Sequence, residues 1–337
     1  MRRGQGDGYL PRDSLILGID GGGTSTLCVA ANLSGEVLGI GVGGPSNHQV
    51  VPLEHTTEAL LRSIGDSLQG YDPNQVVSIC GGMAGIDWPG SEKPIVELFR
   101  SLFPKAVVAA VPDVVIAFHS AIKKLPGIIV ISGTGAMGYG EDISGKEYRS
   151  SGWGYLLGDE GSGYDIGQKG LKAATQAFDG RGPETRLADY ACDCYDISDL
   201  RDLLDIVYSQ GTWSPNRTGE FGPYVVKAAY EGDAVSSDIL NGAGKDLAKT
   251  ALSILHQMDA LEEAITIGQI GGVFANAGPL LHDAFRAELA TEAPRAQIIS
   301  GESHPVLGAL IMAYRDCGKS ELLAFRQSMS DRLQDRL

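Results

Sequence analysis

A strand and glycine-turn pattern that occurs twice constrains the fold of this chain more than any other feature. The first copy reads LILGIDGGGTST at residues 15–26, and the second reads GIIVISGTGAMGYG at residues 127–140. Gly23-Thr24 matches Gly133-Thr134, and Ser34-Gly35 matches Ser144-Gly145, both at a separation of 110 residues. Stacked repeat proteins have periods of about 20–50 residues, so one repeat of this length indicates a duplicated domain.

Each copy predicts a three-stranded meander, because β-rich runs alternate with glycine and Ser-Gly turns. In the first copy the expected strands are 14–20, 26–33 and 36–43. Segments with apolar residues at helical spacing predict helices between later buried strands. The expected helices are 53–68, 92–103, a stretch from Asp113 through Ile122, 164–178, 201–210, 224–232, 239–258 and 305–315. This alternation predicts a layered α/β fold.

Charge and hydropathy limit the partners. Acidic residues outnumber basic ones by 42 to 27, for a net charge of −15, which argues against nucleic acid or an anionic membrane as partner. No run of about 18 apolar residues occurs, and no apolar signal region follows the charged N-terminus. We therefore expect a cytoplasmic protein with a disordered tail at residues 1–13.

The five cysteines predict free thiols and a reducing compartment, because their number is odd and they are widely spread. The Cys192-x-Cys194 pair leaves a metal or redox role open. No second Cys/His pair completes a tetrahedral site with it.

The glycine turns suggest phosphate binding. Glycines after a strand expose backbone N–H groups that can approach phosphate oxygens, and neighbouring hydroxyls add donors. Asp20 would repel phosphate directly but can hold Mg²⁺ through water. A tight hairpin with a capping Asp is the alternative, which the second copy weakens. A P-loop and a Rossmann fingerprint are both absent from the sequence.

Several motifs in order resemble a known family. GIDGGGTST, PDVVIAF, ISGTGAMGYG, GWGYLLGDEGSGYDIG and IGGVFANAG are similar to the N-acetylglucosamine kinase branch of the BadF/BadG/BcrA/BcrD-type ATPases. That family belongs to the actin-like, sugar kinase and heat-shock ATPase superfamily. The resemblance implies a two-lobed, ribonuclease H-like α/β fold with a catalytic cleft, in which ATP and Mg²⁺ support phosphorylation of an amino sugar, usually at O6.

The resemblance also implies domain bounds and partners. We expect an N-terminal lobe at 14–122, a C-terminal lobe at 123–318, and a C-terminal helix of about 319–337 that can pack back on the first lobe. A small sugar is the expected substrate and a homodimer the expected assembly.

By the same resemblance, ATP would be bound by both glycine turns and a third segment, at Gly21, Gly22, Gly23, Thr24, Ser25, Gly133, Thr134, Gly135, Gly271, Gly272 and Asn276. Asp20 would orient Mg²⁺. Asp113 would be the general base, since a carboxylate after a strand can accept the proton of the attacking hydroxyl. A helix N-cap after Pro112 is its alternative role.

The sugar would contact Asn47, Asp113, Trp153, Asp159 and Glu160 by this likeness. Asn47 could instead be an exposed turn residue. Asp159 and Glu160 could instead stabilise the first turn of the following helix through its dipole. His119 is expected to pack in the core, while His48 and Asp87 are weaker candidates for contact with ligand.

One departure leaves the acceptor open. Kinases of N-acetylglucosamine often have Ser where this chain has Ala136, so glucosamine, N-acetylmuramic acid and glucose are alternative substrates. Two rivals of other classes are an activator ATPase of a 2-hydroxyacyl-CoA dehydratase and a non-catalytic sugar sensor. The Cys192-x-Cys194 spacing disfavours the first. The second is disfavoured because a 13-residue N-terminal tail is too short for a DNA-binding extension and because the net charge of the chain, −15, has the wrong sign for binding DNA.

Overall fold

The computed structural model describes residues 10–208, 213–301 and 304–319, and the chain divides into two compact units. The described part of the first unit is 10–123 with 304–319, and that of the second is 124–208 with 213–301. Most of the predicted tail and the predicted helix at about 319–337 lie outside the described residues. Residues 10–13 are described, and Asp13 accepts a hydrogen bond from Gln75 at 2.8 Å, so the prediction of a disordered tail extends too far.

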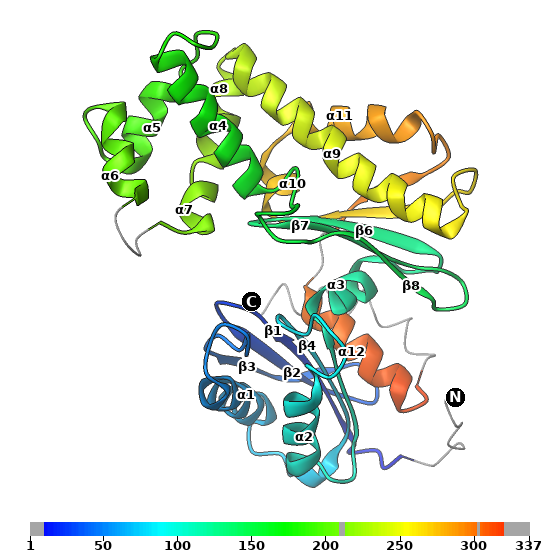
Figure 1. The fold of residues 1–337 in the computed structure, drawn as a ribbon. Coiled ribbons are helices and arrows are strands. Elements are labelled where there is room, and N and C mark those ends of the chain that lie inside the picture. Colours follow the sequence, from blue (N-terminus) through cyan, green and yellow to red (C-terminus); the bar gives the residue numbers. More distant parts are fainter. Residues whose placement is uncertain (1–9, 209–212, 302–303, 320–337) are drawn as a thin grey trace. The chain divides into compact units, whose positions relative to one another are not determined.

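The first unit contains a five-stranded sheet in the order β3-β2-β1-β4-β5 (Figure 1). Its strands are β1 Leu15–Gly21, β2 Thr26–Asn32, β3 Val37–Gly43, β4 Val76–Met83 and β5 Val107–Pro112. The meander of β1, β2 and β3 is antiparallel, whereas β1, β4 and β5 are parallel. The predicted meander therefore forms one side of the sheet.

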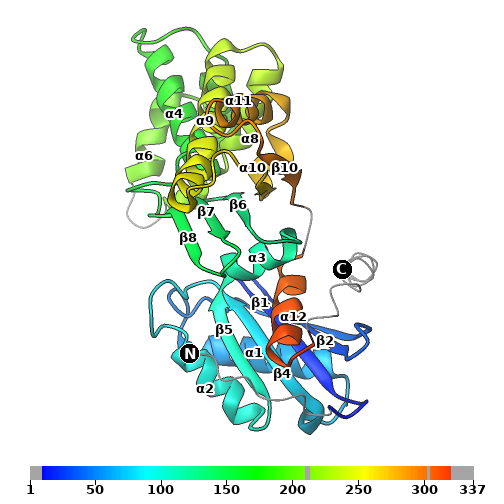
Figure 2. The same cartoon turned by 90° about the vertical axis from the view of Figure 1, so that its right-hand side faces the viewer.

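Helices cover both faces of this sheet. They are α1 Leu53–Leu68, the short 3₁₀ helix η1 Pro73–Gln75, α2 Lys93–Leu102, α3 Asp113–Ala121 and α12 Pro305–Asp316. Leu17 and Ile19 of β1 pack with residues of α1 and α2 on one face, while Ile16 packs with α3 and α12 on the other. Figure 2 shows α12 beside β1 and β4, in agreement with its contacts to both strands. Successive side chains of a strand alternate between faces, so β1 is apolar on both.

The second unit repeats the same topology in the order β10-β9-β6-β7-β8. Its strands are β6 Gly127–Ser132, β7 Ala136–Glu141, β8 Glu147–Ser151, β9 Thr266–Ile270 and β10 Gln297–Ser300. The pairs β6–β7 and β7–β8 are antiparallel, and β6–β9 and β9–β10 are parallel, as in the first sheet. The duplication predicted from the glycine turns is thus confirmed at the level of sheet topology.

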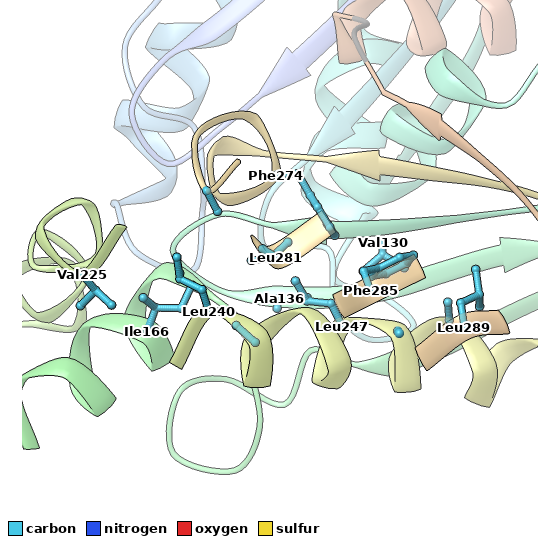
Figure 3. Packing of buried hydrophobic residues seen from close by; sticks show 14 of the residues in the cluster. Val130, Ala136, Ile166, Val225, Leu240, Leu247, Phe274, Leu281, Phe285 and Leu289 are labelled. Carbon is cyan, nitrogen blue, oxygen red and sulfur yellow. The ribbon is translucent and has the colours of Figure 1, made fainter. Parts of the chain in front are cut away.

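The second unit is richer in helices. They are α4 Gly163–Phe178, α5 Leu187–Tyr195, η2 Leu200–Asp202, α6 Leu203–Tyr208, α7 Pro215–Gly219, α8 Gly222–Tyr230, α9 Ala234–Met258, α10 Gly272–Asn276 and α11 Pro279–Ala290. Its core is one apolar cluster in which Leu247 of α9 and Phe285 of α11 pack with Val130 of the sheet (Figure 3). The long helix α9 contacts β6, β7 and β8 and so covers one face of this sheet.

Two further features differ from the sequence predictions. Helix α12 belongs to the first unit, although residues up to 318 were assigned to the C-terminal lobe. It is apolar on several sides because it packs against both α3 and the sheet, with Leu307 and Leu310 buried. Cys192 and Cys194 lie on α5, a helix that was not predicted, and all five cysteines are free thiols as expected.

Candidate active site

Two carboxylates lie at one edge of the first sheet. Asp20 is near the end of β1, and Asp113 follows β5 directly as the first residue of α3. The strands β1, β4 and β5 are parallel neighbours, so their carboxyl ends meet at the same edge. Ligands of α/β sheets bind at this kind of edge.

The two acids differ in their surroundings. Asp20 is largely buried, and burial raises its pKa from the ordinary 3.8 to about 6, with the charge of Asp113 adding to the shift. Asp113 is exposed, and its Oδ1 accepts a hydrogen bond from Val114 N–H at 2.7 Å. The N-cap position itself belongs to Pro112, so the predicted N-cap role falls on the wrong residue, although Asp113 does bind a first-turn N–H.

Asn47 lies at the same edge, in the loop between β3 and α1. Its Oδ1 accepts a hydrogen bond from Gln49 N–H at 3.0 Å, which closes a local turn. A Cβ on Gly85, just beyond β4, would stand 2.4 Å from this Oδ1. Sequence reasoning missed Gly85, whose positive φ of 90° and missing side chain leave room for Asn47.

The first glycine turn joins β1 to β2 beside Asp20. Gly22 N–H donates to Ser25 O at 2.9 Å, and Gly23, Thr24 and Ser25 are exposed. Its base is fixed by Ala84 N–H, which donates to Gly21 O at 2.8 Å. The exposed part of the turn presents backbone and hydroxyl groups, as phosphate binding requires.

The second glycine turn joins β6 to β7 and is held by helix α4. Gly163 N–H donates to Gly133 O at 2.8 Å, and Tyr164 N–H donates to Thr134 O at 3.3 Å. The turn therefore satisfies N–H groups at the start of α4, where a helix leaves them without partners of its own. Ser162 completes the start as N-cap by accepting from Asp165 N–H at 3.1 Å.

Asp159 lies against the second turn. A Cβ on Gly135 would stand 2.9 Å from Asp159 Oδ2, and the side chain is 8% exposed. Burial raises the pKa of Asp159, while hydrogen bonds from Ala136 and Gly154 N–H groups act in the opposite direction. Its backbone is left-handed, with φ of 63°, which is uncommon outside glycine.

Trp153 and Glu160 lie in a different place from Asp159. They line a pocket of about 330 Å³ together with Ser150, Ser151, Leu157, Gly158, Asp246, Lys249 and Thr250. Trp153 is 74% exposed. The three residues predicted from one motif are therefore divided between the second turn and a pocket beside α9.

The predicted nucleoside residues lie on the segment between β9 and α11. A Cβ on Gly271 would stand 2.3 Å from Ser132 O, so this segment abuts the end of β6 and the second turn. Asn276 Nδ2 donates to Gly272 O at 2.7 Å within α10. The second unit thus brings together Gly133, Thr134, Gly135, Gly271 and Gly272.

The side chain of Ala136 does not face this group of residues. It is 5% exposed and belongs to the apolar cluster of the second unit (Figure 3). A serine hydroxyl at this position would be placed in the core. The structure therefore gives no reason to connect Ala136 with ligand choice.

Mg²⁺ fits the surroundings of Asp20. A buried carboxylate whose pKa is raised gains from a nearby cation, and Mg²⁺ bound with phosphates keeps several waters and needs few protein ligands. Across residues 10–208, 213–301 and 304–319, no group of three or more His, Cys, Asp or Glu side chains could hold a metal. The same ranges contain no helix with the length and apolar character needed to cross a membrane.

Comparisons with known proteins connect these features to kinases. Residues 17–313 match the sequence model of the BadF/BadG/BcrA/BcrD ATPase family. An N-acetylmuramic acid/N-acetylglucosamine kinase of Clostridium acetobutylicum is 34% identical over 304 residues, which cover 90% of this chain and 99% of that protein. An N-acetyl-D-glucosamine kinase of Dictyostelium discoideum is 29% identical over 311 residues, covering 89% and 97%.

A solved structure has the same fold. A Chromobacterium violaceum protein assigned provisionally to the N-acetylglucosamine kinases matches with a TM-score of 0.70 and 24% identity, covering 90% of this chain and 100% of that one. The predicted class, a two-lobed α/β fold of the actin-like ATPase kind, is confirmed by this likeness and by the two matching sheets.

Proposed function

Because the chain belongs to the BadF/BadG/BcrA/BcrD ATPase family, we propose that it is an ATP-dependent amino-sugar kinase. The acceptor is N-acetylglucosamine, phosphorylated at O6. The relatives named above are kinases of N-acetylmuramic acid or N-acetylglucosamine, which supports an N-acetylated sugar. Glucosamine, N-acetylmuramic acid and glucose are the alternative acceptors.

The pair of Asp20 and Asp113 is the observation that carries this proposal. The exposed Asp113 accepts the proton of the attacking hydroxyl. A bond forms between the sugar oxygen and the γ-phosphorus, the bond from that phosphorus to the bridging oxygen breaks, and ADP leaves with the electron pair. The proton remains on the Asp113 carboxylate until it is released to solvent.

The glycine turns bind the phosphates of ATP. Gly22 and Gly133 use their own N–H groups within their turns, so we assign phosphate contact chiefly to the residues that follow them. These are Gly23, Thr24 and Ser25 in the first turn and Thr134 and Gly135 in the second. Bound Mg²⁺ supplies positive charge that neutralises the phosphates, and Asp20 would hold it through water.

As the family resemblance implies, we keep Asn47, Asp113, Trp153, Asp159 and Glu160 as the proposed sugar contacts. Planar carboxylates and amides accept and donate hydrogen bonds to ring hydroxyls, and an aromatic face packs on the apolar side of a sugar. Trp153 is suited to this role because much of its ring is exposed. Asp159 is suited to it only through the carboxylate edge that the Ala136 and Gly154 N–H groups leave uncovered.

A coupled ADP-release assay with Mg²⁺-ATP tests the function. The panel contains N-acetylglucosamine, glucosamine, N-acetylmuramic acid and glucose, and it is run with wild type, Asp113→Asn and Asp66→Asn. Asp66 is an exposed acid of α1 and serves as the matched control. We expect one sugar to stimulate turnover, and Asp113→Asn to lower kcat by about 10²- to 10⁴-fold while Asp66→Asn leaves it unchanged.

Two results would overturn parts of this proposal. If none of the sugars stimulates ADP release, the chain is not a kinase of this class. If a sugar stimulates release and Asp113→Asn keeps full turnover, the general base is another group. The expected homodimer and cytoplasmic location stay predictions, and light scattering of the purified protein tests the first of them.

A further inference from the structure

The segment from Gly271 to Gly278 contains a helix that is too short to be stable on its own. Helix α10 has five residues, and isolated helices of that length are unstable in water. Two glycines with positive φ, Gly271 at 107° and Gly278 at 68°, bound the segment. Its place must therefore be set by contacts from neighbouring elements.

His282 of α11 provides the first of these contacts. Its Nε2 is 2.8 Å from Phe274 O in α10, and its Nδ1 is 2.9 Å from Oε1 of the Gln269 side chain in β9. Gln269 is 7% exposed. One imidazole ring thus links the strand before the segment to the helix within it.

Tyr230, the last residue of α8, provides the second contact. Its hydroxyl donates to Ala277 O at 3.0 Å. A Cβ on Gly278 would stand 2.2 Å from the same hydroxyl oxygen, closer than any side chain could approach. Tyr230 therefore fixes the far end of the segment, where α10 ends and α11 begins.

Apolar packing of Phe274 adds to these two hydrogen-bond contacts. The Phe274 ring is 5% exposed and lies 5.8 Å from the His282 ring and 5.7 Å from the Phe285 ring, measured between centroids. Figure 3 shows Phe274 among the buried residues of the second unit. The inner side of α10 is thus anchored, while Gly272 and Asn276 remain on its more exposed side.

We infer that His282 and Tyr230 are positioning residues for the nucleoside of ATP. They hold the segment that carries Gly271, Gly272 and Asn276 against the end of β6, where Ser132 O leaves no room for a side chain at Gly271. This inference rests on the proposed function, which assigns the nucleoside to that segment. A shift of the segment would weaken ATP binding, whereas Asp113 belongs to the other unit.

The test measures KM for ATP and KM for the sugar separately in Tyr230→Phe and His282→Ala. Loss of one neutral hydrogen bond corresponds to about a 2- to 10-fold change in binding. We expect KM for ATP to rise by about that factor in Tyr230→Phe and further in His282→Ala, with KM for the sugar changed less than about twofold. Titration with ADP in the absence of sugar should give a Kd that rises in the same order, from wild type to Tyr230→Phe to His282→Ala.

Matched controls use the same substitutions elsewhere in the second unit. Tyr190 donates to Glu231, and His256 pairs with Glu292 at 2.8 Å on the surface. Tyr190→Phe and His256→Ala should leave both KM values unchanged. Thermal unfolding identifies any variant that fails to fold, and Tyr230→Phe keeps the test valid because it removes a single oxygen atom.

The outcomes separate this inference from the proposed function. If wild type shows no sugar-dependent turnover, the proposed function fails before the variants are compared. If wild type is active and Tyr230→Phe and His282→Ala leave KM for ATP unchanged, or raise both KM values equally, the positioning role is wrong.

Discussion

The two glycine turns occupy equivalent places in the two sheets, yet they are held in different ways. The first is open, since Gly23, Thr24 and Ser25 are exposed and a Cβ on Gly23 would meet nothing within 4 Å. The second is also open at Gly133, but the start of α4 holds it through hydrogen bonds, and Asp159 stands 2.9 Å from the position of a Cβ on Gly135. The two copies share the strand order of their sheets but differ in the contacts that hold the glycine turn.

The acids beside the turns differ in the same sense. Asp20 is on β1 itself, and burial and Asp113 raise its pKa to about 6. At the 110-residue offset the second copy has Val130, which is fully buried, and its acid is supplied by Asp159 from a separate loop. The first turn thus combines exposed hydrogen-bond donors with a carboxylate of raised pKa, which is typical of a catalytic site. The second turn is better suited to hold a ligand in a fixed position.

Asp20→Asn and Asp159→Asn should differ most strongly in their kinetics, because we assign Asp20 to the metal and Asp159 to the sugar. We expect Asp20→Asn to lower kcat/KM by about 10- to 100-fold and to require more Mg²⁺ for half-maximal rate, because it removes the charge that holds the metal's water shell. Asp159→Asn should raise KM for the sugar without changing the Mg²⁺ requirement. Steady-state rates over a Mg²⁺ series measure both, and equal Mg²⁺ curves for the two variants would remove the distinction.

The raised pKa of Asp20 predicts a dependence of stability on pH. The native state keeps its proton up to about pH 6, whereas the unfolded chain loses it near the ordinary 3.8. The free energy of unfolding contributed by this proton is present below about pH 4 and is lost as pH rises through about 6. The free energy of unfolding of Asp20→Asn should not fall in this way with rising pH, because the asparagine side chain cannot ionise.

We therefore expect Asp20→Asn to be as stable as wild type near pH 4 and more stable near pH 8, by at most about 3 kcal/mol. Urea unfolding of the ligand-free protein at several pH values measures the difference. Asp66→Asn, which changes an exposed acid, should show no such trend. A difference that shrinks with rising pH would contradict the assigned cause.

The second turn should be sensitive to added volume. In Gly135→Ala the new methyl group would meet Asp159 Oδ2 at 2.9 Å, so we expect a loss of about 1–3 kcal/mol in the free energy of unfolding. Combining it with Asp159→Ala removes the clash. The double variant should then lose less than the sum of the two single changes, and strict additivity would show that Asp159 is not the obstacle.

Local patterns in the sequence were sufficient for most of the fold. Predicted helix 53–68 coincides with α1, and the glycine turns gave the duplicated topology, because periodicity and turn chemistry act over a few residues. The unit to which α12 belongs could not be predicted in this way. Its apolar residues signal burial, but whether it packs on the first or the second sheet depends on contacts more than 180 residues away, such as that of Ser120 with His304.

The candidate site was predictable in part for the same reason. Asp20 is near the end of one strand and Asp113 directly follows another, so a shared sheet edge could be foreseen from their positions. Asp159 and Glu160 are adjacent in sequence and face different surroundings, because the left-handed backbone at Asp159 turns the chain between them. His282 and Tyr230 carry no motif, and only the folded chain brings them to α10.

Gly23→Ala should have the smallest effect on stability. Its Cβ meets nothing within 4 Å and its backbone needs no positive φ, so the free energy of unfolding should change by less than about 0.5 kcal/mol. KM for ATP should still rise, because a methyl group would stand between the exposed backbone and a phosphate. A large loss of stability would mean that the first turn is as closely held as the second, and the contrast between an open turn and an anchored one would fail.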